Sequence, residues 1–93
     1  LMDHELPPEI QARVKEIAHG HARVRGTHDV RTRRSGQTYF IQLHLMLDDQ
    51  MPLVEAHRIA DEVEAAIMAA FPNADVLIHE DPASEPPPRP LPA

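Results

Sequence analysis

The segment 38–47 alternates strictly between two kinds of side chain, and this pattern constrains the fold of the 93-residue chain more than any other feature. One set is apolar and comprises Tyr39, Ile41, Leu43, Leu45 and Leu47. The other set is half polar and comprises Phe40, Gln42, His44 and Met46. Because successive side chains of a strand point to opposite sides of a sheet, the pattern predicts a strand with one face in the core. The other face is expected to meet solvent, a partner or a ligand.

Amphipathic helices are predicted on both sides of this strand. In residues 7–19 the apolar positions recur at i, i+4, i+7 and i+8, prolines stand near the start, and Gly20 follows the last turn. In residues 53–70 the apolar stripe comprises Ala56, Ile59, Ala60, Val63, Ile67 and Ala70. Each helix therefore has one face that must pack against another layer.

Two further strands are predicted, over residues 24–33 and 75–81. The first should place on one face Val24, Gly26, His28, Val30 and Thr32. A turn at Ser35 and Gly36 joins it to the 38–47 strand as a hairpin. Because a strand–helix–strand connection within one sheet normally makes the two strands parallel, the last strand should run parallel to 38–47. The expected fold class is α+β, a two-layer sandwich in the order α-β-β-α-β with a three-stranded mixed sheet.

Three segments are expected along the chain. Residues 1–6 form a boundary segment, and the opening Leu1-Met2 suggests a piece of a larger protein. Residues 7–82 form the folded domain. Residues 82–93 contain six prolines in twelve positions, so 83–93 is expected to be a disordered tail. No run approaches about 18 consecutive apolar residues, so the chain is expected to be soluble.

The charge and the histidine content limit the function classes. The net charge is −6 with histidines neutral, which argues against nucleic-acid binding and suits the attraction of cations. The chain has no cysteine, so it has neither disulfides nor thiolate metal ligands. It has seven histidines, and histidine is the commonest metal ligand. Any metal site must therefore use imidazole and carboxylate groups.

Several of these groups stand where they could share a metal ion. His28 and His44 lie on the two strands of the predicted hairpin and can meet across it. His79 and Asp81 are i, i+2 on the last strand and project from the same face, and His57 stands in the first turns of the second helix. Zn²⁺ accepts such ligands in near-tetrahedral geometry. Each histidine taken singly is more often a solvated polar residue, but four together in so short a chain favour a metal site.

The stretch 26–33, with the sequence GTHDVRTR, resembles the G-x-H-D-(L/V)-R-(T/A)-R motif of the cation diffusion facilitator family. The similarity continues in the same order through 40–45, 52–57, 60–61, 63–64, 71–72 and 75–82. It covers about residues 6–82, nearly the whole predicted domain. The likeness is closest to the bacterial zinc/ferrous-iron efflux type.

The resemblance implies a metallochaperone-like fold and a place in a larger transporter. The chain would be the cytoplasmic C-terminal domain of a dimeric transporter of the inner (cell) membrane, whose membrane part exchanges metal for protons. Domains of this family bind a pair of metal ions at the homodimer interface. Carried over position by position, the implied ligands are His28, His44, His57, His79 and Asp81, with Asp81 bridging the ions. Glu80 stands where close members often have glutamine, so it could ligate through its side chain or its carbonyl, or not at all.

The leading functional hypothesis is regulatory metal binding. Zn²⁺, or another divalent ion such as Fe²⁺, Cd²⁺, Co²⁺, Ni²⁺ or Mn²⁺, would fill sites shared by two subunits and stabilise the closed, transport-competent dimer. The main alternative is a plain homodimerisation domain without metal sensing. A hydrolytic metalloenzyme would need a cleft and a general base, and the sequence offers no plausible substrate pocket. An RNA-binding module of similar topology would need a glycine-rich clamp loop and basic charge. No catalytic residues and no enzymatic activity are therefore expected.

Overall fold

The fold is built around β3 (Thr38–Leu47), an inner strand of a four-stranded sheet with the order β1-β2-β3-β4. The computed structural model describes residues 4–85. The other elements are β1 (His4–Glu5), α1 (Pro8–His19), β2 (Gly26–Ser35), α2 (Leu53–Ala70) and β4 (Ala74–Pro82). β3 pairs antiparallel with β2 and parallel with β4, which confirms the predicted mixed sheet.

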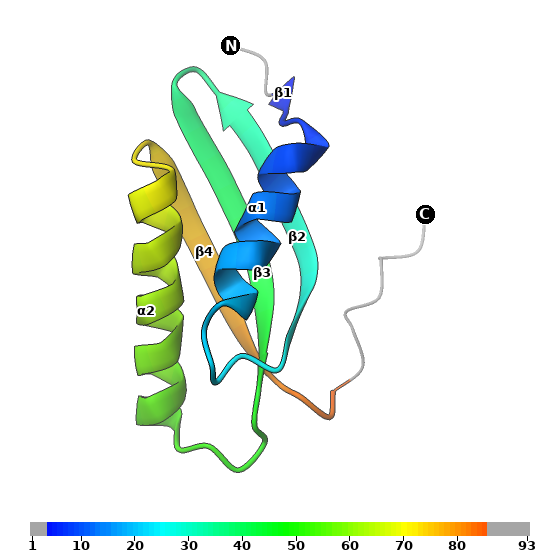
Figure 1. The fold of residues 1–93 in the computed structure, drawn as a ribbon, viewed down its shortest axis with the longest axis vertical. Coiled ribbons are helices and arrows are strands. Elements are labelled where there is room, and N and C mark those ends of the chain that lie inside the picture. The colour runs from blue at the N-terminus through cyan, green and yellow to red at the C-terminus, as the bar shows by residue number, and fades with distance from the viewer. Residues whose placement is uncertain (1–3, 86–93) are drawn as a thin grey trace.

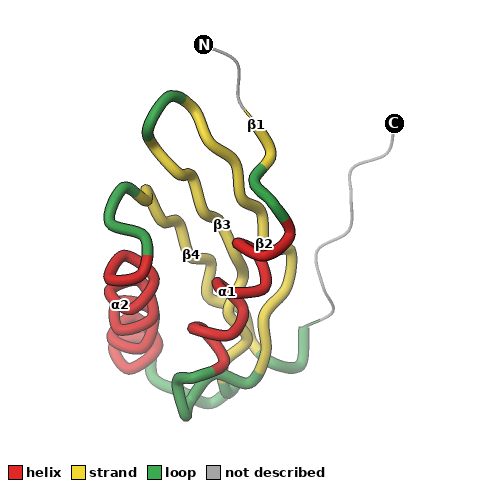
Figure 2. The backbone as a smooth tube through the Cα atoms, turned by 45° about the horizontal axis from the view of Figure 1, so that its top comes forward, coloured by secondary structure: helices red, strands yellow, loops and turns green. Residues whose placement is uncertain are grey.

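Both helices lie on the same side of the sheet (Figures 1 and 2). α1 packs over β2, α2 lies along β4, and the two helices contact each other. This arrangement confirms the predicted two-layer α+β sandwich. Within residues 4–85, the opposite side of the sheet has no helix over it. We refer to that side as the open face.

The core lies between the helix layer and the apolar face of β3. The buried residues of that face are Ile41, Leu43, Leu45 and Leu47. The helices add Val14, Ala18, Ile59, Ala60, Val63 and Ile67. Each valine, leucine or isoleucine side chain buried in this way stabilises the fold by roughly 1.5–3 kcal/mol relative to exposure. The alternation of 38–47 therefore predicted the core face of this strand correctly.

The sheet has four strands, so the expectation of three was wrong. β1 pairs antiparallel with the end of β2, with His4 opposite Arg34 and Glu5 opposite Arg33. Leu6, directly after β1, is buried and holds this segment against the fold. A strand of two residues has too few side chains to show an alternating pattern, so the sequence carries no periodic signal for it.

The β2–β3 turn lies one residue later than predicted. Ser35 still pairs with Thr38, so the connection consists of Gly36 and Gln37. Gly36 has a φ of 60°, a conformation that glycine adopts without steric cost.

β2 contains a β-bulge between His28 and Arg31. His28 lies opposite His44 and Arg31 lies opposite Gln42, so two residues of β2 face one residue of β3 between these pairs. The bulge therefore shifts the register of the hairpin by one residue.

This bulge overturns one expectation about β2. Simple alternation predicts that His28, Val30 and Thr32 share one face. In the structure Val30 packs against the core and Thr32 is buried, whereas His28 projects from the open face with His44. A one-residue shift moves side chains to the opposite face, so alternation assigns residues before and after a bulge incorrectly.

The ends of the predicted domain are partly described. The boundary segment 1–6 includes β1, while residues 1–3 lie outside the described residues. Residues 83–85 form a turn after β4, and the rest of the predicted disordered tail, 86–93, also lies outside them. Between residues 4 and 85 no helix is long and apolar enough to cross a membrane.

Replacing Leu43 with alanine should lower the free energy of unfolding by roughly 2–5 kcal/mol, because a truncated core side chain leaves a cavity. Leu77→Ala is the matched control, since Leu77 is 54% exposed on the neighbouring strand. The control should change stability by no more than about 0.5 kcal/mol. Urea unfolding followed by circular dichroism measures both, and equal losses would contradict the assignment of the two faces.

Candidate metal centre

Three histidines form a row across the open face. His28 of β2 lies opposite His44 of β3, and His44 lies opposite His79 of β4. We refer to these three residues as the histidine row. Residues directly opposite one another on neighbouring strands project from the same face and are in reach of each other. The structure therefore places three of the implied ligands on the same face of the sheet, one on each of three neighbouring strands.

His44 makes the closest contacts in the row. Its Nδ1 lies 2.8 Å from Oδ2 of Asp81, a hydrogen bond that the imidazole donates to the carboxylate. Its ring stacks on the ring of His79, with centroids 4.6 Å apart and planes 15° apart. The side chains of His44 and Asp81 are 16% and 26% exposed. With the proton on Nδ1, the neutral ring keeps a free lone pair on Nε2, which is the form that binds a metal ion.

The other two implied ligands lie away from the histidine row. His57 belongs to α2, on the helix side of the sheet, where its Nε2 lies 3.4 Å from Oδ2 of Asp61. Both side chains of this pair are largely exposed. Glu80 alternates with His79 and Asp81 along β4, so its side chain points toward the helix side. It lines a pocket of about 180 Å³ near the start of α2.

The donor set fits a divalent ion in its chemistry but is incomplete in one chain. Imidazole nitrogen and carboxylate oxygen both serve as Zn²⁺ ligands. In the described part of the chain, residues 4–85, no three His, Asp or Glu side chains converge so that they could hold one ion. One chain therefore presents paired donors, His44 with Asp81 and His57 with Asp61, in place of a full coordination sphere.

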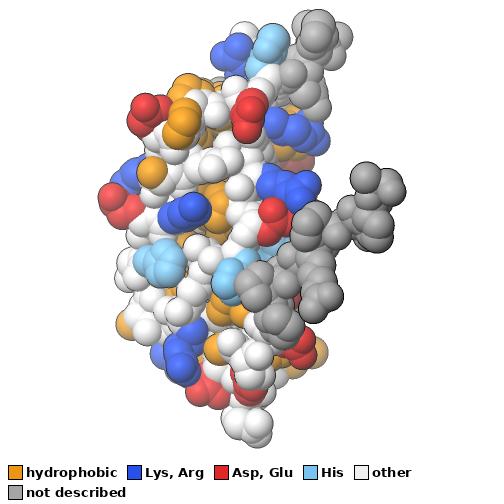
Figure 3. Space-filling model, turned by 90° about the vertical axis from the view of Figure 1, so that its right-hand side faces the viewer, with side chains coloured by type: hydrophobic (Ala, Val, Ile, Leu, Met, Phe, Trp, Pro, Cys, Tyr) orange, Lys and Arg blue, Asp and Glu red, His pale blue; other side chains and the backbone are white. Residues whose placement is uncertain are grey.

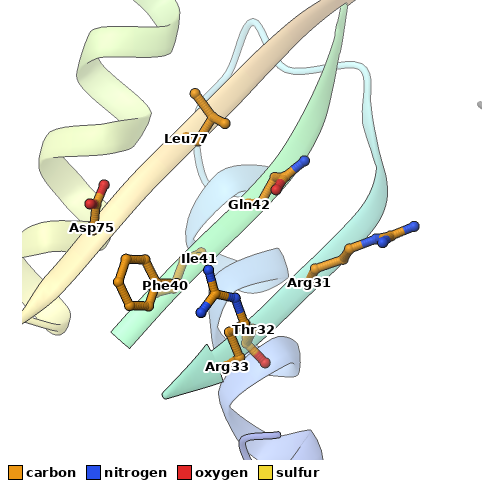
Figure 4. A pocket seen from close by; sticks show the side chains of 8 residues that line it. All are labelled: Arg31, Thr32, Arg33, Phe40, Ile41, Gln42, Asp75 and Leu77. Carbon is orange, nitrogen blue, oxygen red and sulfur yellow. The ribbon is translucent and has the colours of Figure 1, made fainter. Parts of the chain in front are cut away.

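Beside the histidine row, the open face has a hollow of about 420 Å³ (Figure 4). It is lined by Arg31, Thr32, Arg33, Phe40, Ile41, Gln42, Asp75 and Leu77. The guanidinium of Arg33 lies 4.3 Å from the centre of the Phe40 ring, a cation–π contact. Nε of Arg31 donates to the carboxylate of Asp29 at 3.0 Å. Arg31 and Arg33 are therefore engaged locally.

Charges of both signs are interspersed over the side of the molecule that Figure 3 displays. A nucleic-acid interface needs a contiguous basic footprint, and the chain carries a net charge of −6. The surface seen in this view therefore does not favour a nucleic-acid partner.

Two histidines outside the row take part in contacts around the α1–β2 connection. Nε2 of His19 lies 3.1 Å from Oγ1 of Thr27. Nε2 of His21 lies 2.9 Å from Oε1 of Glu62, and its Nδ1 accepts the backbone N–H of Arg23 at 3.1 Å. The hydrogen bond from Arg23 requires an unprotonated Nδ1 on His21, so the geometry favours a neutral His21 ring with its proton on Nε2. His21 thus links this connection to α2.

Asp49 is a neighbour of the candidate site that the sequence reasoning missed. It accepts a hydrogen bond from the backbone N–H of Ser84 at 3.1 Å, and the N–H of Ala83 bonds to the carbonyl of Leu47 at 2.7 Å. These bonds fasten the chain directly after Asp81. The Ser84 hydroxyl, and then its backbone N–H, hold the pKa of the Asp49 carboxyl below its usual value. No local pattern marks this residue, because its partner is 35 positions away.

Residues 6–83 match the sequence model of a family described as cation efflux protein, cytoplasmic domain. The chain belongs to this family. The match confirms the predicted relation to cation diffusion facilitators and the predicted place in the cytoplasmic part of a transporter.

This cation efflux domain is similar to proteins of known name and structure. It is 54% identical over 84 residues to the cation-efflux pump FieF of Yersinia pestis (strain Pestoides F), a match that covers 90% of this chain and 28% of FieF. The zinc form of CzrB superposes with a TM-score of 0.78 at 39% identity, covering 91% of this chain and 98% of that chain. A variant C-terminal domain of MamM in its manganese form has a TM-score of 0.74 at 26% identity, covering 81% and 96%. The chain thus spans little more than a quarter of FieF but nearly all of the two solved domains.

The lowered pKa of Asp49 predicts a contribution to stability that acid removes. The contribution is present above the usual pKa of 3.8 and is lost as the pH falls through the lower pKa of the folded state. Ser84→Ala removes the hydroxyl and should raise the pKa of Asp49 toward its usual value. An NMR titration of the Asp49 carboxyl carbon measures this in both proteins. A midpoint of 3.8 or higher in the native chain would show that the Ser84 contact has no such effect.

Proposed function

We propose that this domain is the regulatory metal-binding part of a divalent-cation efflux transporter. It binds Zn²⁺ or a similar ion at a homodimer interface and stabilises the closed, transport-competent dimer. The observation that carries this proposal is the hydrogen-bonded pair of His44 and Asp81 beside His28 and His79, on the open face of the sheet. The exchange of metal for protons is assigned to the membrane part of the parent transporter.

The width of the histidine row favours two ions over one. Neighbouring strands lie about 4.8 Å apart, so the backbones of His28 and His79 are separated by roughly 10 Å across β3. Two nitrogen ligands of one Zn²⁺ lie at most about 4 Å apart, because each Zn–N bond is about 2.0–2.1 Å long. Side chains that stand upright from the sheet would therefore place the two outer histidines on different ions. Asp81 would bridge the two ions if its carboxylate exchanged the hydrogen bond to Nδ1 of His44 for metal ligation.

We assign the fifth ligand, His57, to the partner chain. Within its own chain His57 lies on the helix side of the sheet, away from the histidine row, and its side chain is 72% exposed. Leu53 and Val54, one turn earlier in α2, are 80% and 79% exposed. Exposed apolar side chains beside a candidate ligand favour a protein contact at this end of the helix. The side chain of Glu80 points away from the row and is not included in the proposed site.

A site divided between two chains gives the metal ion a regulatory effect. A ligand shifts a population toward the form that it binds more tightly, and by no more than the difference between its two affinities. One chain lacks a complete ligand set, so the ion should bind more tightly to the closed dimer. The solved zinc form of CzrB supports Zn²⁺ as the first ion to test. Imidazole and carboxylate sites also accept Fe²⁺, Cd²⁺, Co²⁺, Ni²⁺ and Mn²⁺.

A homodimerisation domain without metal sensing is the second candidate. It is favoured by Leu77, which is 54% exposed on the open face and lines the same hollow as Phe40. Metal titration separates the two candidates, because only a sensing domain gains stability from the ion. We propose no enzymatic role, since the paired donors His44 and Asp81 lie on an open sheet face and not in a substrate cleft.

The double variant His79→Ala, Asp81→Ala should lose protection by Zn²⁺ against thermal unfolding. A free ion at about 100 times its dissociation constant stabilises a one-site protein by about 2.7 kcal/mol, and this gain disappears with the ligands. Differential scanning fluorimetry with and without Zn²⁺ measures the protection.

The matched control is His19→Ala, Asp75→Ala, which removes one histidine and one aspartate from outside the proposed site. It should keep the protection of the native chain. Unchanged protection in His79→Ala, Asp81→Ala would contradict the assignment of these two residues as ligands. No protection of the native chain would favour the plain homodimerisation domain.

Mixed dimers test whether His57 ligates across the interface. One chain carries His57→Ala and the other carries His79→Ala, Asp81→Ala, so neither variant forms a complete site with itself. In a mixed dimer the first chain supplies the histidine row with Asp81, and the second supplies His57. Calorimetric titration of dimers purified through two different tags should show one restored site of near-native affinity. If His57 ligates within its own chain, the mixed dimer will restore none.

A further inference from the structure

The pairing of His28 with His44 in the candidate metal centre differs from the register that the β2–β3 turn sets. Counted without interruption from the Ser35–Thr38 pair, His28 would lie opposite Leu45, whose side chain is in the core. In the structure His28 lies opposite His44. The β-bulge between the turn and His28 makes this difference, because it adds one residue to β2.

Asp29 has the backbone conformation that marks this bulge. Its φ is 50°, and no other non-glycine residue in the described part of the chain has a positive φ. Most L side chains avoid this region, whereas Asp and Asn are several-fold enriched there. Its Oδ1 accepts a hydrogen bond from Nε of Arg31 at 3.0 Å, so a side-chain contact spans the bulge.

The bulge allows β2 to bury apolar side chains on the turn side and to place His28 on the open face on the other side. On the turn side of the bulge, Val30 packs against the core and Thr32 is buried, while Arg31 and Arg33 lie on the open face (Figure 4). On the other side of the bulge, His28 lies on the open face. A regular strand that kept Val30 and Thr32 inside would turn His28 into the core as well.

We infer that Asp29 is a positioning residue of the metal centre, whose backbone conformation holds the bulge that turns His28 from the core to the histidine row. Asp29 acts through His28 and does not itself bind the ion. This inference rests on the proposed metal-binding function and adds to it the residue on which one ligand depends.

Substitutions at position 29 separate backbone conformation from side-chain charge. Asp29→Gly and Asp29→Asn tolerate a positive φ, whereas the β-branched Asp29→Val does not. In calorimetric titrations, Asp29→Val should weaken Zn²⁺ binding on the order of tenfold, and the other two should stay near the native affinity. Asp29→Ala is a less strained second variant if Asp29→Val does not fold. Asp75→Val, at an exposed regular position of β4, is the matched control and should leave the affinity unchanged.

The variant His28→Ala distinguishes positioning from a general loss of stability. If Asp29 acts through His28, Asp29→Val should weaken Zn²⁺ binding no further once position 28 carries alanine. An equal loss in both backgrounds would overturn the inference.

The dependence of the strand register on Asp29 can also be measured in the metal-free chain, independently of zinc binding. Cross-strand nuclear Overhauser contacts between the backbone protons of His28 and His44 report the register directly. They should be present in the native chain and in Asp29→Gly, and they should weaken or vanish in Asp29→Val. Undiminished contacts in Asp29→Val would overturn the inference. If the native chain shows these contacts but binds no Zn²⁺, the proposed function fails while the dependence of the register on Asp29 stands.

Discussion

The burial of one face of β3 is the constraint on which the rest of the structure depends. Ile41, Leu43 and Leu45 are at most 1% exposed, and both helices pack on their side of the sheet. Because side chains alternate along a strand, the same burial turns His44 to the open face. The neighbouring strands pair with β3 on either side, and their registers then decide which residues join His44. The candidate metal centre is thus the reverse side of the strand that organises the core.

The open face of one chain carries only part of the proposed ligand set. The pair of His44 and Asp81 is held by a 2.8 Å hydrogen bond, while His57 stands on the other layer of the domain. A site complete within one chain would bind metal without regard to a partner. A site divided between chains would make metal affinity depend on the dimer, which is the physical requirement for a regulatory ion. A domain of this size buries only about 60–65% of the surface that its unfolded chain exposes, so its core contributes little stability. An ion that bridges two subunits would add to that stability.

Local periodicity predicted two elements of the fold to the residue, β3 at 38–47 and α2 at 53–70. Both have a continuous apolar stripe, and a stripe needs only nearby residues to be visible. β1 was missed because its two residues cannot show a period. The grouping of His28 with Val30 and Thr32 on one face of β2 was wrong for a different reason. The bulge at Asp29 is a single-residue irregularity, and its effect appears only when β2 is paired with β3.

The amino-acid pattern was enough to predict the order of α1, β2, β3, α2 and β4, the core face of β3 and the kinds of metal ligand available. These follow from composition and from patterns within single segments. Local patterns did not predict the bulge that sets His28 opposite His44, the separation of His57 from the histidine row, or the bond from Asp49 to the chain beyond Asp81. Each of these depends on strand register or on contacts between residues far apart in the chain. Register and distant contacts are set by how whole elements pack together, and no local pattern encodes them.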